Sequence, residues 1–234
     1  MTNIETCEVM LSTGHGKHQT GYLARPQGDA RRTSVIVLHD MFGLNEPIRE
    51  IADGYARRGF VALVPNMFWR SSNPNAIPYD NAQHPAAWAR LKALKLGLAA
   101  EDIGMWVGLL RGKAYCNGKV AAVGFCGGGR LAFLAAARSG VDAAASLYGL
   151  GISEHLGELT DVKCPLQLHY GQCDQHIPKA EIDKVANGVQ GHAGTEVLLY
   201  PEAGHSFANP VRPTYDPAAA ALAFERIDAM LKRL

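Results

Sequence analysis

The sequence predicts a doubly wound α/β fold, in which a mostly parallel sheet is flanked by helices. Short, mostly apolar runs alternate with amphipathic helical stretches along the whole chain. The apolar runs lack a polar face, which is typical of parallel strands buried on both sides. Hydrophobic residues make up 47% of the 234 residues and charged ones 19%, so the chain can form one large core. We therefore expect a single domain over residues 1–234.

The first predicted element is an antiparallel hairpin at one edge of the sheet. Segments Glu5–Ser12 and His18–Ala24 alternate in polarity and flank a short loop, residues 13–17, that contains glycine. Six further runs have the length and apolar character of buried strands. They are Ser34–His39, Phe60–Pro65, Lys119–Gly124, Ala143–Tyr148, Pro165–Tyr170 and Glu196–Tyr200.

Helices are predicted between these strands, and two of them carry clear start signals. Asn45 is typical of an N-cap before a helix over Glu46–Arg58, and Asp216 followed by proline begins the last helix. In that last helix we expect one apolar stripe, formed by Leu222, Ile227, Leu231 and Leu234. The other predicted helices are a long one near Pro85–Arg111, then Gly127–Arg138 and Pro178–Val189.

Composition narrows the class of partner. The 23 Lys and Arg residues against 22 Asp and Glu give a net charge of +1, which disfavours nucleic acid and anionic membranes as partners. The N-terminus lacks the apolar core of a signal peptide and no run of about 18 apolar residues exists, which predicts a cytoplasmic location. Five cysteines without CxxC or zinc spacing predict reduced thiols.

One motif has a spacing that reactive chemistry requires. Gly124-Phe125-Cys126-Gly127-Gly128 lies between a predicted strand and a predicted helix, which is typical of a nucleophile elbow. The flanking glycines leave room where strand and helix pass close together. The Gly-x-Cys-x-Gly spacing is expected by chance only about 0.06 times at this composition. The alternative, a buried cysteine in a nucleotide-binding turn, lacks the GxGxxG spacing and the Lys-Ser/Thr pair.

The predicted helix that starts at Gly127 also favours reactivity at Cys126. Its free backbone N–H groups and the positive end of its dipole point toward the thiol. They favour the thiolate, and they supply one donor to an oxyanion.

Such a nucleophile needs a base and a group that orients the base, in the chain order acid then histidine. Asp174 and His205 follow two predicted strands, so both are expected at the carboxyl edge of the sheet, where open α/β sheets bind ligands. His176, two residues after Asp174, is an alternative base. His169 lies inside a predicted strand and is expected to be packed in the core.

Five segments carry a resemblance that extends over essentially the whole chain. They are VIVLHDMFGLN, NGKVAAVGFCGGG, LYGLG, the turn Gly171–Asp174 and EAGHSFA. On these segments the sequence resembles the dienelactone hydrolase family. The resemblance implies the α/β-hydrolase fold, a Cys126-His205-Asp174 triad without metal, and substrates that are small lactones or activated esters.

The resemblance also implies roles for the loop after the first parallel strand. The backbone N–H of Met41 would be the second oxyanion donor, with that of Gly127 the first. Asp40 stands where the family usually has a glutamate that holds the resting thiol. Alternatively, Asp40 is a loop carboxylate that accepts hydrogen bonds from nearby backbone N–H groups.

The residues expected to bind the substrate differ from the pattern of the family. Members that act on dienelactone bind its carboxylate with arginines, one of them directly after the HSFA segment, where this chain has Asn209. We therefore expect neutral lactones or esters to be preferred as substrates.

The Asn-, Pro- and Ser-rich stretch Trp69–Gln83 is expected to be a surface loop bordering the site. Arg90, Arg130 and Arg212 could replace the missing arginine, although the sequence around each of them is more typical of a charge on the protein surface. We expect the pocket to include His84, Arg130, Tyr148, Phe207 and Asn209.

The sequence thus predicts a hydrolase, monomeric or a small homo-oligomer, that opens a lactone or small carboxylic ester through Cys126. Three alternatives remain. One is a general carboxylesterase or thioesterase with the same triad, and another is a non-catalytic ligand-binding protein of this fold. The third is a redox protein that pairs Cys126 with Cys173, although no CxxC spacing supports it.

Overall fold

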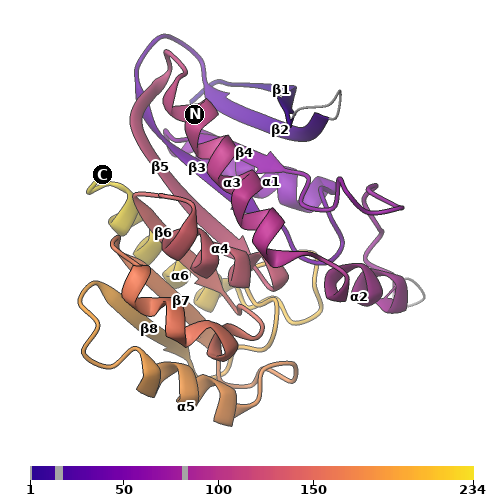
Figure 1. Ribbon diagram of the computed structural model, residues 1–234, viewed down its shortest axis with the longest axis vertical. Helices are drawn as coiled ribbons and strands as arrows, with labels where there is room; N and C mark the ends of the chain where they lie inside the picture. The colour runs from indigo at the N-terminus through magenta and orange to yellow at the C-terminus, as the bar shows by residue number, and fades with distance from the viewer. Residues whose placement is uncertain (1, 14–17, 81–83) are drawn as a thin grey trace.

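The computed structural model describes residues 2–13, 18–80 and 84–234, and these residues contain an eight-stranded sheet (Figure 1). The strand order is β1-β2-β4-β3-β5-β6-β7-β8. The strands β3 to β8 pair in parallel, whereas the hairpin β1–β2 joins β4 in antiparallel fashion. Their bounds are β1 Ile4–Ser12, β2 His18–Pro26, β3 Arg32–Leu38, β4 Val61–Pro65, β5 Cys116–Phe125, β6 Ala143–Leu147, β7 Leu166–Gly171 and β8 Thr195–Tyr200.

The predicted doubly wound sheet with a hairpin at one edge is therefore confirmed. Most of the predicted hairpin loop, residues 14–17, lies outside the described residues. The central strands β3 and β5 are buried along most of their length, and their carboxyl ends lie side by side because Leu38 pairs with Gly124. Loops that follow these two strands consequently meet at one edge of the sheet.

Helices cover both faces of the sheet. In Figure 1, α3, α4 and α5 lie in front of it and α1 and α6 lie behind it. Tyr55 of α1 packs edge-on against Phe224 of α6, with ring centroids 6.3 Å apart. The bounds are α1 Glu46–Arg57, α2 His84–Lys92, α3 Leu96–Arg111, α4 Gly127–Arg138, α5 Lys179–Gly188 and α6 Pro217–Leu231, with a 3₁₀ segment, η2, over Ile152–Asp161.

Both predicted helix starts are confirmed, and one predicted stripe is partly wrong. The Asn45 side chain accepts a hydrogen bond from the N–H of Ile48 (3.3 Å), and Asp216 accepts two at the start of α6. Leu222 is 40% exposed. Ile227 and Leu231 are buried as predicted, and the rest of the apolar buried face of α6 consists of three alanines and Met230.

The single long helix expected near Pro85–Arg111 is wrong, because two helices, α2 and α3, occupy this stretch. The chain is extended at Lys95 (φ −81°, ψ 95°), although the intervening residues favour helix. Helix α2 instead turns toward the carboxyl edge of the sheet. There Leu91 packs so closely on Gly127 that a Cβ at Gly127 would lie 2.5 Å from the Leu91 Cδ1. Tertiary contacts at this edge override the local helix preference.

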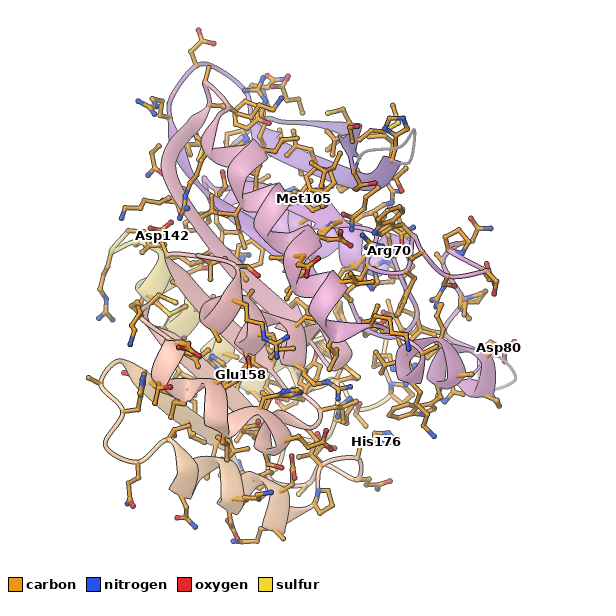
Figure 2. All side chains as sticks on the ribbon, in the orientation of Figure 1. Arg70, Asp80, Met105, Asp142, Glu158 and His176 are labelled. Carbon is orange, nitrogen blue, oxygen red and sulfur yellow. The ribbon has the colours of Figure 1, made fainter. Side chains whose placement is uncertain are left out.

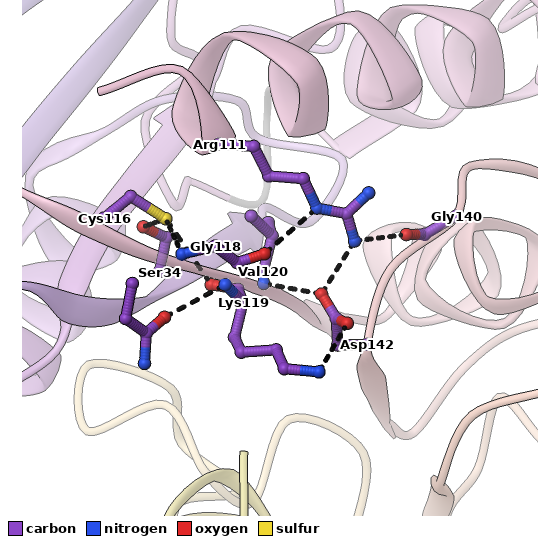
Figure 3. A network of polar contacts seen from close by, with 9 residues as sticks. Ser34, Arg111, Cys116, Gly118, Lys119, Val120, Gly140 and Asp142 are labelled. Atoms are coloured by element: carbon purple, nitrogen blue, oxygen red, sulfur yellow. Dashed lines mark hydrogen bonds and ion pairs between the residues drawn. The ribbon is translucent and has the colours of Figure 1, made fainter. Parts of the chain in front are cut away.

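A polar network fixes the start of β5 (Figure 3). The Asp142 carboxylate accepts hydrogen bonds from Arg111 Nη2 (2.7 Å) and from the N–H of Val120 (2.9 Å). On the other side of the strand, the Cys116 thiol is hydrogen-bonded to the Ser34 hydroxyl (3.3 Å). These contacts join β5 to α3, to β3 and to the residue before β6. The strand that leads to Cys126 is therefore held firmly at its other end.

Candidate active site

Cys126 occupies a sharp turn between β5 and α4. Its backbone has φ 56° and ψ −116°, a sparsely populated conformation that costs free energy for any residue with a Cβ. The predicted need for glycine on both sides is confirmed. A Cβ at Gly124 would lie 1.9 Å from the carbonyl oxygen of Gly128, and a Cβ at Gly128 would lie 2.1 Å from that of Leu38. The turn thus presents the thiol at the carboxyl edge of the sheet.

Asp174 and His205 meet beside this turn. His205 Nδ1 lies 2.7 Å from Asp174 Oδ2, and the Cys126 side chain is close enough to influence the pKa of the imidazole. The other carboxylate oxygen of Asp174 accepts the backbone N–H groups of His176 (2.7 Å) and Ile177 (3.0 Å). Both oxygens of this buried carboxylate are therefore engaged, which fixes its orientation toward His205.

The surroundings keep His205 protonated. Burial, the largest influence, lowers its pKa, but the charges of Cys126 and Asp174 and the hydrogen bonds to both outweigh burial and raise the pKa to about 10. An imidazolium at neutral pH can donate a proton to a leaving group.

Aromatic rings surround His205. The Tyr148 ring centroid lies 5.1 Å and that of His176 4.8 Å from His205. Trp88 of α2 approaches His176 with centroids 6.2 Å apart, and Figure 2 shows His176 on the side of the molecule where α2 lies. Phe207 is fully buried and packs edge-on against Tyr148, with ring centroids 5.3 Å apart, so it supports Tyr148 and exposes no surface of its own.

Asp40 and Asn209, the two departures from the family pattern, are joined through Tyr79. Asp40 Oδ1 accepts the N–H of Phe42 (2.9 Å), and its Oδ2 accepts the Tyr79 hydroxyl (2.9 Å). Asn209 Nδ2 donates to the same Tyr79 oxygen (3.0 Å). Burial raises the pKa of Asp40, whereas the hydrogen bonds from the Phe42 N–H and the Tyr79 hydroxyl and the charge of Arg212 oppose the rise. In this structure both oxygens of Asp40 are engaged by groups other than the thiol.

The two arginines Arg130 and Arg212 and the histidine His84, all expected near the pocket, do not all lie together. The Arg212 guanidinium carbon lies 5.3 Å from the Phe42 ring centroid and 5.1 Å from that of Tyr79. The His84 ring also lies near that of Phe42, tilted by 57° with centroids 5.2 Å apart. Arg130 instead lies against the turn after β6, where a Cβ at Gly151 would be 3.2 Å from its Nη1. Arg212 and His84 are thus beside the Asp40 loop.

Tyr79 was not predicted to take part in the site, and Arg90 was predicted only as a possible replacement for the missing arginine. Tyr79 belongs to the loop that was predicted to border the site, but nothing in the sequence singles it out. Residues 69–80 of this loop do border the site, and residues 81–83 lie outside the described residues. Arg90 was expected to be a surface charge, and this is wrong, because it is only 8% exposed. The expectation that His169 is packed in the core is confirmed.

The two predicted oxyanion donors lie at adjoining turns. Gly127 is the first residue of α4, so its N–H has no acceptor within the helix. Met41 follows β3 in a turn closed by a hydrogen bond from the Gly43 N–H to the Asp40 carbonyl (3.3 Å).

Within residues 2–13, 18–80 and 84–234, no cluster of three or more His, Cys, Asp or Glu residues could hold a metal ion. No helix of this same part of the chain has the length and apolarity to cross a membrane.

A mixed sheet with an elbow after its central strand, and with an acid and a histidine after β7 and β8, defines the α/β-hydrolase class. The sequence model of the dienelactone hydrolase family matches residues 20–234, and the chain belongs to this family. The carboxymethylenebutenolidase of Pseudomonas putida is 33% identical over 89% of each chain, and that of Pseudomonas sp. strain P51 is 30% identical over 86% of this chain and 84% of its own. The protein is an ester or lactone hydrolase.

Solved structures share the fold. A structure from Klebsiella pneumoniae superposes with a TM-score of 0.89 at 24% identity and covers 99% of this chain and all of its own. A dienelactone hydrolase from Anabaena variabilis superposes with a TM-score of 0.72 at 18% identity, with 98% of each chain covered.

Proposed function

We propose that this enzyme opens a lactone or small carboxylic ester through a Cys126 thiolate, with His205 as the acid and base and Asp174 as the residue that orients His205. The observation that supports this most directly is the His205–Asp174 pair, 2.7 Å between Nδ1 and Oδ2, beside a cysteine at a strained elbow. The chemistry needs no cofactor, and the substrate is the only partner it requires.

In the first half of the reaction, the thiolate sulfur bonds to the carbonyl carbon and the carbonyl electron pair moves onto oxygen. The N–H groups of Gly127 and Met41 stabilise that oxyanion. When the carbonyl re-forms, the bond to the leaving oxygen breaks and His205 supplies the proton. The product is a thioester on Cys126 and a new hydroxyl or enol, which departs when the substrate is an ester and stays on the acyl chain when it is a lactone.

In the second half, neutral His205 removes a proton from water, and the hydroxide oxygen attacks the thioester carbon. Collapse of this intermediate releases the carboxylic acid and the Cys126 thiolate. His205 keeps the proton that it took from water, so the pair of thiolate and imidazolium is restored. Asp174 holds the imidazole in one tautomer throughout. An alkoxide or enolate leaves from such an intermediate more readily than an amine, which favours esters and lactones over peptides.

A hydrolysis panel tests the proposal. We expect p-nitrophenyl esters, dienelactones and neutral lactones to include good substrates. Acid quench during turnover should trap one acyl group, and peptide mass spectrometry should locate it on Cys126. Cys173→Ser, which removes the exposed thiol near the site, is the control and should keep the adduct. Hydrolysis without an adduct, or with the acyl group on another residue, would overturn the proposal.

Substrate charge gives a separate prediction, centred on Arg212 and Asn209. The Arg212 guanidinium lies over the Phe42 and Tyr79 rings beside Asn209, whereas Asn209 itself carries no charge. We expect Arg212→Gln to lower the ratio of kcat/KM for a carboxylated lactone to that for its methyl ester, by about tenfold or more. Asn209→Arg should raise the same ratio.

The control for this prediction is Arg130→Gln, because Arg130 lies against the turn at Gly151. It should leave the ratio of acid to ester unchanged. Preference of the wild type for the neutral ester remains the expectation from Asn209. An unchanged ratio in Arg212→Gln would show that Arg212 does not contact the substrate carboxylate.

A further inference from the structure

Arg90 is a buried arginine whose guanidinium holds three backbone carbonyls. Its Nη1 donates to the carbonyl oxygens of Asn73 (3.1 Å) and Asn75 (2.6 Å), and its Nη2 donates to that of Met41 (2.8 Å). The guanidinium carbon lies 4.1 Å from the centroid of the Phe68 ring. Burial lowers the pKa of Arg90 to about 10, so the group keeps its charge at neutral pH.

The Met41–Phe42 peptide is consequently held at both ends. Arg90 binds its carbonyl oxygen, and Asp40 Oδ1 accepts its N–H. Tyr79 in turn holds the other oxygen of Asp40. The Met41 N–H belongs to the preceding peptide, and only the two backbone dihedrals of Met41 separate it from this fixed plane. The clamp therefore restricts the direction of that N–H.

The turn is built around the guanidinium. A Cβ at Gly43 would lie 3.1 Å from Arg90 Nη2, and Gly43 has φ 89°. The next residue of α2, Leu91, packs against Gly127, the other predicted donor. One turn of α2 thus contacts both backbone segments that would form the oxyanion hole, which gives a function to the break between α2 and α3.

We propose that Arg90 is a positioning residue that directs the Met41 N–H toward the oxyanion formed when Cys126 attacks a substrate carbonyl. This inference rests on the proposed function. Lysine cannot replace it, because an ammonium is a compact point charge, whereas the planar fork of arginine reaches carbonyls on separate segments.

The test compares two reactions of the same thiol in the wild type and in Arg90→Lys. Acylation by p-nitrophenyl acetate forms a sulfur–carbonyl bond through an oxyanion and expels p-nitrophenolate. Alkylation by iodoacetamide forms a sulfur–carbon bond at a saturated carbon and expels iodide, with no oxyanion. Because loss of one oxyanion donor costs about a hundredfold or more, we expect a partly misdirected donor to slow acylation about 10- to 100-fold. Alkylation should stay within about threefold.

Arg70→Lys is the matched control. Arg70 lines the same cavity of about 610 Å³ as Arg90, but it pairs with Asp102 and lies beside α3 (Figure 2). Both of its rates should equal those of the wild type. If Arg90→Lys fails to fold, as judged by circular dichroism, Phe68→Leu removes the ring beneath the guanidinium and should give a smaller loss confined to acylation.

The outcomes separate this inference from the proposed function. Unchanged acylation in Arg90→Lys, or an equal fall in acylation and alkylation, would overturn the positioning role alone. A wild-type enzyme that is alkylated at Cys126 but never acylated there would overturn the proposed function, and the positioning role with it. A selective loss of acylation in Arg90→Lys, absent from Arg70→Lys, supports both.

Discussion

Replacement of Cys126 by alanine is expected to abolish hydrolysis of every ester and lactone that the wild type accepts. The sulfur is the atom that bonds to the substrate in the proposed mechanism, and loss of a nucleophile costs on the order of 10⁴-fold or more in kcat/KM. Alanine is smaller and fits the turn, so the free energy of unfolding should change by only about 1 kcal/mol. Steady-state kinetics with p-nitrophenyl acetate, together with chemical denaturation, measure both quantities. Activity above about a tenth of the wild-type value would contradict the assignment.

Cys126→Ser separates the shape of the nucleophile from its acidity. Serine keeps nearly the same volume, but a hydroxyl ionises far less readily than a thiol beside the His205 imidazolium. We expect most of the rate to be lost while the unfolding transition is unchanged. Comparable rates for the serine and cysteine enzymes would show that a thiolate is not the attacking species.

The sequence could predict the sheet and the elbow because both follow from local constraints. Buried parallel strands must be apolar on two faces, and this is visible in runs such as SVIVLH. The approach of β5 to α4 leaves no space for side chains at Gly124 and Gly128. Such requirements act on neighbouring residues, so a short window of sequence contains them.

The interior of the site depends instead on contacts between distant segments. Asn209 donates to Tyr79, 130 positions earlier, and Tyr79 donates to Asp40. Nothing near any of these residues in the sequence indicates the other two. Arg90 looks like an ordinary charge on an amphipathic helix until the fold brings three carbonyl groups around it. The separate helix α2 also makes contacts with distant segments, among them Leu91 on Gly127 and Arg90 on the Met41 carbonyl, which are not visible in the local sequence.

The second large effect is expected from His205 and Asp174 acting as one unit. His205→Ala removes the group that carries the proton in both half-reactions. Asp174→Asn keeps an oxygen for the N–H groups of His176 and Ile177, so the loop should stay in place while the charge facing His205 is lost. We expect each single variant to lose about 10³- to 10⁴-fold in kcat, because a carboxylate-to-amide change in such a triad has an effect of that size.

Because Asp174 acts only through the imidazole, the double variant should be little worse than His205→Ala alone. The measurement is a double-mutant cycle in kcat/KM, with the free energy of unfolding determined for all four proteins. His176→Ala is the matched control: its ring touches His205 edge-on at 4.8 Å, yet in the proposed mechanism it moves no proton, so its loss should cost only about several-fold. Additive losses in the cycle would mean that Asp174 and His205 serve different steps. In that case a loss in His176→Ala as large as in His205→Ala would reassign the base to His176, whose backbone N–H already binds Asp174.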